Sequence, residues 1–95
     1  MQFSRELRAG VASGEITVSF RLWTRPQVKV GKRYAVEGEE IEIDSIELVP
    51  FSSVTRADVR RCGERDLESL RQRTAHAGPV FDDTLVYRID FHVVS

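Results

Sequence analysis

The sequence predicts a small α+β domain in which a curled sheet or open barrel has short helices at its side. The chain has 95 residues, and its 41% hydrophobic and 31% charged residues are typical of a globular protein. Two runs of alternating apolar and polar residues, 16–23 and 85–94, predict strands, and helical signals precede the first run and separate the two. Few strands with helices between them indicate one domain over residues 1–95.

A helix and then a strand are expected at the start of the chain. Phe3, Leu7 and Val11 are spaced for one face of a helix, with Ser4 as a candidate N-cap and an end near Gly14. The strand that follows has one apolar face, formed by Ile16, Val18, Phe20 and Leu22. Its other face carries two hydroxyls, a guanidinium and an indole, which belong to Thr17, Ser19, Arg21 and Trp23.

A hairpin is expected in the middle of the chain. Proline and glycine place a loop at residues 24–31, and a short strand at 32–36 follows it. Gly38 marks the turn into a long strand at 40–49, which is rich in Ile and Val. The alternation slips by one residue near Ser45, which predicts a bulge, and a proline ends the strand.

Two short helices are expected before the last strand. Thr55 and Asp58 form a capping signal for the first helix. Asp66 is a candidate cap for the second, in which Leu67 and Leu70 are expected to face inward.

The two alternating runs also predict the core. We expect the apolar side chains of the first run to pack beside the aromatic and aliphatic ones of the last. These residues are Ile16, Val18, Phe20, Leu22, Tyr87, Ile89 and Phe91.

Composition excludes several classes of protein. No run of about 18 apolar residues is present, as a membrane span would need, and the N-terminal residues lack the pattern of a signal peptide. The single cysteine, Cys62, cannot form an internal disulfide. A cytoplasmic protein is therefore expected.

Metal and cofactor chemistry is not indicated either. Cys62, His76 and His92 are isolated in the sequence, whereas a zinc site needs several closely spaced ligands. No glycine-rich phosphate loop or dinucleotide fingerprint is present. We therefore expect no metal and no cofactor.

Charge is distributed unevenly along the chain. Residues 1–33 hold seven basic and two acidic residues, whereas residues 37–47 hold six acidic residues and no basic one. This asymmetry is compatible with a basic face that contacts nucleic acid, or with an ordinary solvated surface whose strands pair opposite charges. The candidate nucleic-acid contacts are Arg5, Arg8, Arg25, Lys29, Lys32 and Arg33.

The polar face of the strand at 16–23 is the candidate binding site. A guanidinium can donate a forked pair of hydrogen bonds to phosphate or to a base edge, and a neighbouring indole can stack on a base. Thr17 and Ser19 add hydroxyls beside Arg21 and Trp23. The alternative is a structural Arg–carboxylate pair with the acidic strand.

Several segments of the chain resemble an ASCH domain, a compact relative of the PUA domains that bind RNA. The matching segments are residues 14–21 (GEITVSFR), 28–31 (VKVG), 58–70 (DVRRCGERDLESL) and 86–91 (VYRIDF). The resemblance implies a small PUA-like β-barrel with two or three short helices packed at its side.

The resemblance also implies a ligand-binding pocket. Some ASCH proteins are amidohydrolases that remove an acetyl group from modified cytidine with a lysine, a hydroxyl and a glutamate. Thr17, Ser19 and Arg21 match the family pattern, and the acid position falls around Gly63–Glu64, with Glu64 as the candidate, but Ile16 replaces the lysine. Isoleucine cannot act as a base or nucleophile.

Three functions therefore stay open. The first is a non-catalytic domain that binds RNA or a modified nucleotide in a polar pocket. The second is a hydrolase of acylated nucleosides that uses other groups, and the third is a protein-interaction domain with a vestigial pocket.

Overall fold

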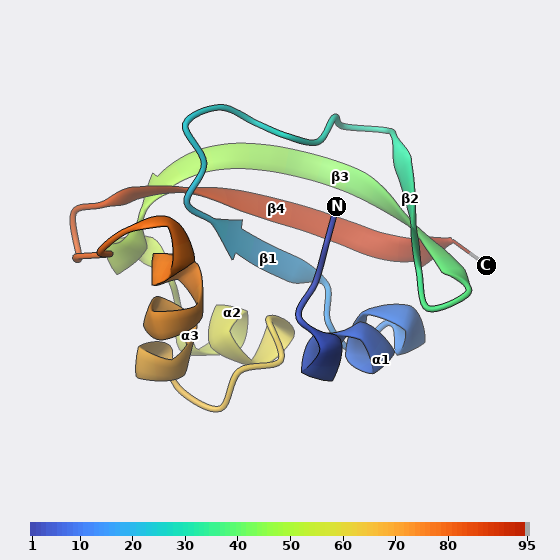
Figure 1. The fold of residues 1–95 in the computed structure, drawn as a ribbon, viewed down its shortest axis with the longest axis horizontal. Coiled ribbons are helices and arrows are strands. Elements are labelled where there is room, and N and C mark those ends of the chain that lie inside the picture. Colours follow the sequence, from blue (N-terminus) through green and yellow to red (C-terminus); the bar gives the residue numbers. More distant parts are fainter. Residues whose placement is uncertain (95) are drawn as a thin grey trace.

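The computed structural model describes residues 1–94, which form four strands, three helices and two single 3₁₀ turns (Figure 1). The helices are α1 (Arg5–Ser13), α2 (Arg56–Arg61) and α3 (Leu67–Thr74). The strands are β1 (Val18–Arg21), β2 (Arg33–Val36), β3 (Glu39–Pro50) and β4 (Leu85–Val94). The 3₁₀ turns are η1 (Phe51–Ser53) and η2 (Ala75–Ala77).

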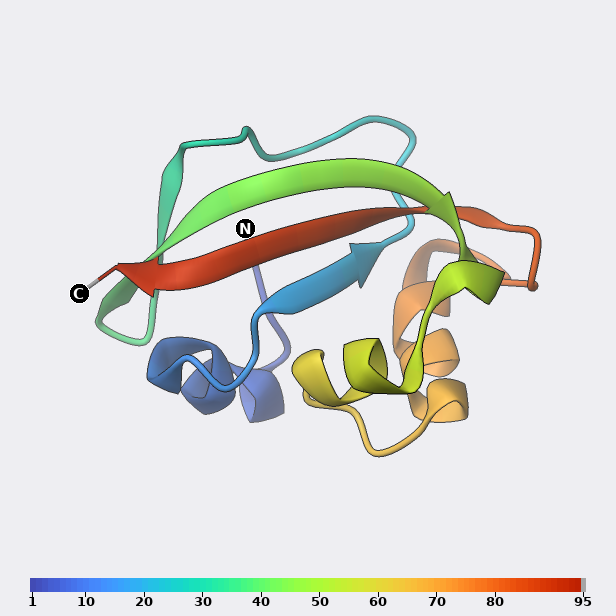
Figure 2. The same cartoon turned by 180° about the vertical axis from the view of Figure 1, so that it is seen from behind.

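The strands form one open antiparallel sheet. Its order is β1-β4-β3-β2, so β1 and β2 are the edges of the sheet in the described residues. Figures 1 and 2 show the three helices beside the β1 edge, with α1 toward one end and α2 and α3 toward the other. The α+β class is confirmed, and the four strands curve without closing into a barrel.

β1 is shorter than the alternating run that predicted it. The backbone N–H of Ile16 donates to Gly10, and that of Thr17 donates to the carbonyl of Arg61, in place of the regular ladder with β4. Paired residues therefore begin at Val18, although the carbonyl of Thr17 still accepts a hydrogen bond from the backbone N–H of Phe91 in β4.

Local signals placed the hairpin, the bulge and the caps of α2 and α3 correctly, whereas Ser4 precedes α1 without forming a side-chain capping hydrogen bond. Glu37 and Gly38 both have positive φ, as a two-residue turn between β2 and β3 requires. The register between β3 and β4 shifts at residues 43–45, which confirms the predicted bulge. Thr55 and Asp58 form a reciprocal capping box on α2, and Asp66 caps α3.

Two apolar clusters cover opposite faces of the sheet. Val18 and Phe20 pack with residues of α2, α3 and η1, whereas Ile89 and Phe91 belong to a second cluster with Phe3, Val11 and β3. The predicted single core was therefore wrong in one respect. Ser19 pairs with Ile89 and Arg21 with Tyr87, so the apolar residues of β4 lie beside the polar side chains of β1.

Three side chains are less buried than expected. Leu67 is 42% exposed, whereas Leu70 is buried, so only the second leucine of α3 faces inward. Leu67 is the first residue of its helix. Leu22, directly after β1, and Tyr87 of β4 are half-buried.

None of the helices in residues 1–94 is long and apolar enough to cross a lipid bilayer.

Truncation of Phe20 should destabilise the domain. Phe20 is buried in the cluster that joins β1 to α2 and α3, so Phe20→Ala is expected to lower the free energy of unfolding by ~3–5 kcal/mol. Phe81→Ala is the matched control, because Phe81 is 62% exposed and its loss should cost less than about 0.5 kcal/mol. Equal urea midpoints for the two variants would show that β1 is placed in the wrong register.

Candidate functional site

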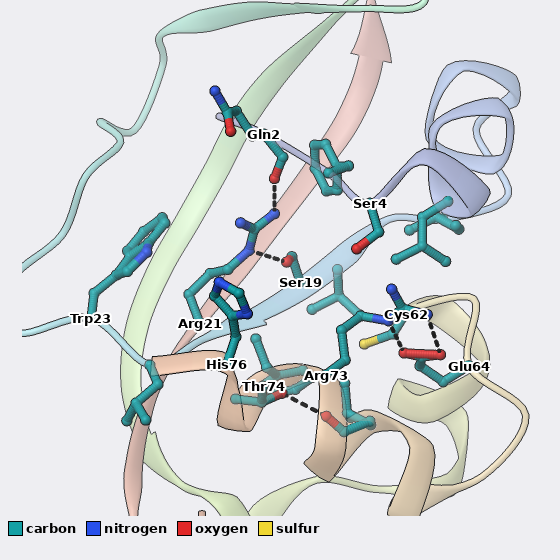
Figure 3. A pocket seen from close by; sticks show the side chains of 17 residues that line it. Gln2, Ser4, Ser19, Arg21, Trp23, Cys62, Glu64, Arg73, Thr74 and His76 are labelled. Carbon is teal, nitrogen blue, oxygen red and sulfur yellow. Dashed lines mark hydrogen bonds and ion pairs between the residues drawn. The ribbon is translucent and has the colours of Figure 1, made fainter. Parts of the chain in front are cut away.

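A cavity lies at the free edge of β1. It has a volume of about 420 Å³, which is within the range of small-molecule sites. Its walls come from the segment before α1, from β1 and the two residues after it, and from α3 with η2 (Figure 3). The polar side chains that line it are Gln2, Ser4, Ser19, Arg21, Glu64, Arg73, Thr74 and His76, together with the indole of Trp23.

Arg21 is the cation at the centre of this site. Its Nε donates to the Ser19 hydroxyl at 2.8 Å, and one Nη donates to the backbone carbonyl of Gln2 at 2.6 Å. No carboxylate in residues 1–94 forms an ion pair with it at 4.0 Å or less. Burial lowers the pKa of Arg21 from its usual value. A guanidinium stays protonated in proteins, so Arg21 is a largely desolvated and uncompensated charge.

Two aromatic rings flank the guanidinium. The Cζ atom of Arg21 is 5.0 Å from the ring centroid of Phe3 and 5.7 Å from that of Trp23. Trp23 also packs against Tyr87, with 6.3 Å between the ring centroids. These rings hold the cation in place by cation–π contact without neutralising its charge.

Thr17 takes part in a different set of contacts. Its hydroxyl accepts a hydrogen bond of 2.8 Å from Arg61, and Thr17 is not among the residues that line the cavity. The structure therefore brings together Ser19, Arg21, Trp23 and Glu64 of the predicted site and places Thr17 apart from them.

An ion network joins β4 to α2. Arg88 contacts Asp58 at 2.9 Å and Asp90 at 3.0 Å, and Arg61 contacts Asp90 at 2.9 Å. Burial alone would raise the pKa of Asp58 and of Asp90. Hydrogen bonds to these carboxylates, from Arg88 above all, outweigh the burial and lower both pKa values. Asp90 is thus paired with both Arg88 and Arg61.

Glu64 is held by a partner that the sequence did not reveal. Both of its carboxylate oxygens accept from Arg73 of α3, and Arg73 also donates to Glu6 of α1 at 2.8 Å. These contacts raise the pKa of Arg73, first through its hydrogen bonds to Glu64. Glu64 is therefore an acceptor already occupied by a cation. Arg73 carries no sequence signal of this role, because the pairing depends on how α3 packs.

Ile16, where the resemblance to ASCH proteins leads us to expect a lysine, is a tightly packed apolar side chain. It is buried, and a Cβ atom on Gly63 would lie 2.5 Å from its Cδ1 atom, while one on Gly10 would lie 2.7 Å away. Gly63 also has φ of +78°, which favours glycine. Ile16 and the two glycines therefore fit one another closely.

Cys62 lines the cavity, but its thiol is a poor nucleophile. Burial, and then the negative charges of Asp58 and Glu64, raise the pKa of the thiol to about 12. The thiolate, which is the nucleophilic form, is scarce at neutral pH.

The predicted nucleic-acid contacts lie on two segments. Arg5 and Arg8 are on α1, and the other four lie in the loop before β2 and at its start. Arg33 is paired with Glu42 at 3.2 Å, and Arg8 donates to the carbonyl of Phe3 at 3.0 Å. The side chains of all six are exposed, and they are Arg5, Arg8, Arg25, Lys29, Lys32 and Arg33.

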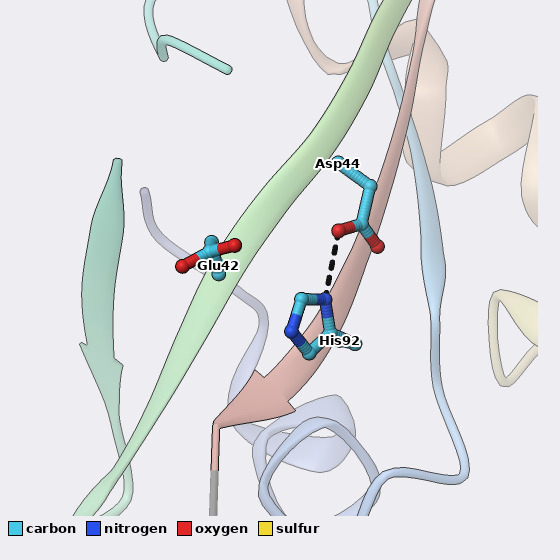
Figure 4. A group of neighbouring side chains, drawn as sticks. All are labelled: Glu42, Asp44 and His92. Carbon is cyan, nitrogen blue, oxygen red and sulfur yellow. Dashed lines mark hydrogen bonds and ion pairs between the residues drawn. The ribbon is translucent and has the colours of Figure 1, made fainter. Parts of the chain in front are cut away.

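One group of side chains has the composition of a metal site. Donor atoms of Glu42, Asp44 and His92 lie within 4.8 Å of one another on β3 and β4 (Figure 4). Glu42 is also paired with Arg33, and His92 contacts Asp44 at 2.8 Å. The sequence did not suggest this group, because the β3–β4 register brings together residues that are far apart in the chain.

Solved structures share this fold. An ASCH domain from Lactobacillus crispatus has a TM-score of 0.74 at 21% identity, and the match covers 93% of this chain and 70% of that one. A protein from Enterococcus faecalis has a TM-score of 0.69 at 18% identity, with 94% of this chain and 67% of that one covered. No family model matches the sequence, and no curated protein matches it. The fold is that of an ASCH domain, which confirms the resemblance seen in the sequence.

Loss of Arg21 should affect stability far less than loss of Arg88. Arg21→Ala removes a cation without leaving a carboxylate unpaired, so the free energy of unfolding should change by no more than about 1 kcal/mol. Arg88→Ala leaves Asp58 and Asp90 short of a partner and should cost at least ~2 kcal/mol, toward the ~3–5 kcal/mol typical when a buried pair is broken. A large loss in Arg21→Ala alone, measured by urea unfolding without ligand, would show that Arg21 is structural.

The network should also make the domain sensitive to acid. The pKa values of Asp58 and Asp90 are lower in the folded state, so the unfolded chain binds more protons in acid. This stabilisation is complete above the unfolded pKa of about 3.9 and is lost as pH falls through the folded values. Asp90→Asn should flatten the fall in unfolding free energy between about pH 5 and pH 2. The control Asp83→Asn changes an exposed carboxyl and should leave that slope unchanged.

Proposed function

We propose that this chain is a non-catalytic binding domain that holds a nucleotide, free or within RNA, in the cavity at the β1 edge. The observation that carries the proposal is the uncompensated charge of Arg21 inside that cavity. A desolvated cation without an anionic partner is costly, and functional sites tolerate such a cost where a ligand offsets it.

The free donors of Arg21 match the oxygens of a phosphate. A guanidinium has five N–H donors, and only two of them are used, by Ser19 and by Gln2. These two contacts are to neutral acceptors, so they orient the group and leave its charge available. Phosphate groups accept forked hydrogen bonds from arginine, and this supports an anionic ligand.

Trp23 and the resemblance to PUA domains supply the rest of the argument. An indole at the cavity can stack on a base, and stacking contributes ~1–3 kcal/mol per base in single-strand binding proteins. PUA domains, which ASCH domains resemble, bind RNA. The exposed basic residues of α1 and the β1–β2 loop are then available for the backbone of a longer strand.

The hydrolase alternative finds less support. Ile16 is wedged against Gly10 and Gly63 in place of a lysine, and Glu64 is engaged by Arg73. A hydrolase on this framework would need another general base. A protein-interaction domain with a vestigial pocket is the remaining alternative, and a failure to bind any nucleotide would favour it.

Nucleotide binding should depend on Arg21. Trp23 is the only tryptophan, so its fluorescence reports on the cavity during titration with AMP, CMP, GMP, UMP and short single-stranded RNA. Arg21→Gln is expected to weaken binding about 10-fold to 100-fold, as loss of a charge-assisted hydrogen bond does. Arg56→Gln is the matched control, because Arg56 is exposed on α2 and away from the cavity.

Two results would count against the proposal. One is equal affinity in the parent protein and Arg21→Gln, and the other is no binding of any nucleotide or RNA at millimolar concentration. With RNA, the logarithm of affinity should fall with the logarithm of salt concentration by about 0.7 for each phosphate contacted. An RNA affinity that does not change with salt concentration would exclude the exposed basic residues as phosphate contacts.

A further inference from the structure

A histidine, His76, lines the cavity together with Arg21. Of the ionisable side chains that line it, Arg73 and Glu64 neutralise each other, while Arg21 and His76 have no ion pair recorded in residues 1–94. His76 lies on η2, directly after α3, and is exposed. Figure 3 shows the labelled side chains of Arg21 and His76 on the same side of the cavity.

We propose that Arg21 and His76 together form a subsite for a terminal phosphate monoester, with the Ser19 hydroxyl as a third donor. The subsite would take a mononucleotide or the phosphorylated end of an RNA strand, and would disfavour an internal phosphodiester. This inference rests on the proposed function, because it assigns the ligand class of the same cavity.

Charge is the first reason. A phosphate monoester carries about −1.5 to −2 at pH 7, whereas a diester carries about −1. With Arg73 matched by Glu64, the lining has one net positive charge from Arg21, and the imidazole of His76 is a further basic group that can interact with an anion. A monoester presents more negative charge to these two side chains than a diester does, so the pair favours the monoester.

Hydrogen-bond direction is the second reason. Ser19 accepts from Arg21, which leaves its own O–H free to donate toward the cavity. Arg21 retains three N–H groups, and no hydrogen bond is recorded for the His76 ring within the described part of the chain. The donors of all three side chains therefore suit an acceptor-rich group with three terminal oxygens.

Among the described residues that line the cavity, no unpaired carboxylate competes for His76. The charged groups that share the cavity with it are Arg21 from β1, Arg73 from α3 and Glu64 from the α2–α3 loop, and Glu64 is bound to Arg73 on both oxygens. The Cys62 thiol is neutral, because its pKa is raised to about 12. A bound phosphate would thus be the anion available to His76.

Three ligands that differ only at the phosphate test this inference. They are adenosine, AMP, and the 5′-methyl ester of AMP, which is a monoanionic diester. Dissociation constants are measured by Trp23 fluorescence and by calorimetry at pH 6.5. The parent protein is expected to bind AMP at least about 10-fold more tightly than the methyl ester, which corresponds to one charge-assisted contact.

Variants of His76 test whether this side chain causes the preference for AMP over its methyl ester. His76→Gln should reduce the ratio of the two dissociation constants to below about threefold, and His76→Lys should restore it by fixing a positive charge. His92→Gln, which changes the other histidine and lies outside the cavity, should leave the ratio unchanged. An RNA oligonucleotide with and without a 5′-phosphate distinguishes a strand end from a mononucleotide as the source.

The outcomes separate this inference from the proposed function. If AMP and its methyl ester bind equally and both require Arg21, the proposed function stands and the monoester subsite is overturned. The same holds if His76→Gln keeps the full preference while its melting temperature matches the parent. If no nucleotide or RNA binds at millimolar concentration, the proposed function itself fails.

Discussion

The ion network between β4 and α2 positions the segments that line the cavity. Arg88 bridges Asp58 and Asp90, and Arg61 extends the network from Asp90 to the hydroxyl of Thr17. The capping box ties Asp58 to the first turn of α2, so the helix start and the strand share one carboxylate. Because Arg61 ends α2, the network also fixes the loop that carries Cys62 and Glu64 into the cavity.

Cross-strand register leaves the charge of Arg21 uncompensated. The half-buried arginines Arg61, Arg71, Arg73 and Arg88 all have carboxylate partners. Arg21 alone among the half-buried arginines of residues 1–94 is held by neutral acceptors and aromatic rings. Arg21 pairs with Tyr87, whereas Asp90 pairs with Val18, so Asp90 projects from the opposite face of the sheet and is engaged by Arg88 and Arg61. An arginine that is positioned but not neutralised is suited to an anionic ligand.

Local signals in the sequence were sufficient for the elements and for part of the site. Residues near in sequence determine the hairpin at Gly38, the bulge near Ser45 and the caps at Thr55 and Asp66, and the structure has each of them. The alternating runs also placed Ser19, Arg21 and Trp23 on one side of β1. Which residues of β4 lie beside them depends on cross-strand register, and the pairing of Glu64 with Arg73 depends on helix packing. Cross-strand register and helix packing depend on residues far apart in the chain, so neither produces a periodic pattern in the sequence.

Ile16 is an apolar element of the cavity that packs tightly against two glycines. Its side chain is packed where a Cβ on Gly10 or Gly63 would collide with it, so the three positions form one fitted apolar unit between α1 and the α2–α3 loop. A lysine there would have to bury an ammonium group in this unit, and an unpaired buried charge is strongly unfavourable. The acid that lines the cavity, Glu64, is already bound by Arg73, and Arg73 also links α1 through Glu6. This part of the cavity thus joins α1 to α3, while Arg21 has no carboxylate partner in residues 1–94.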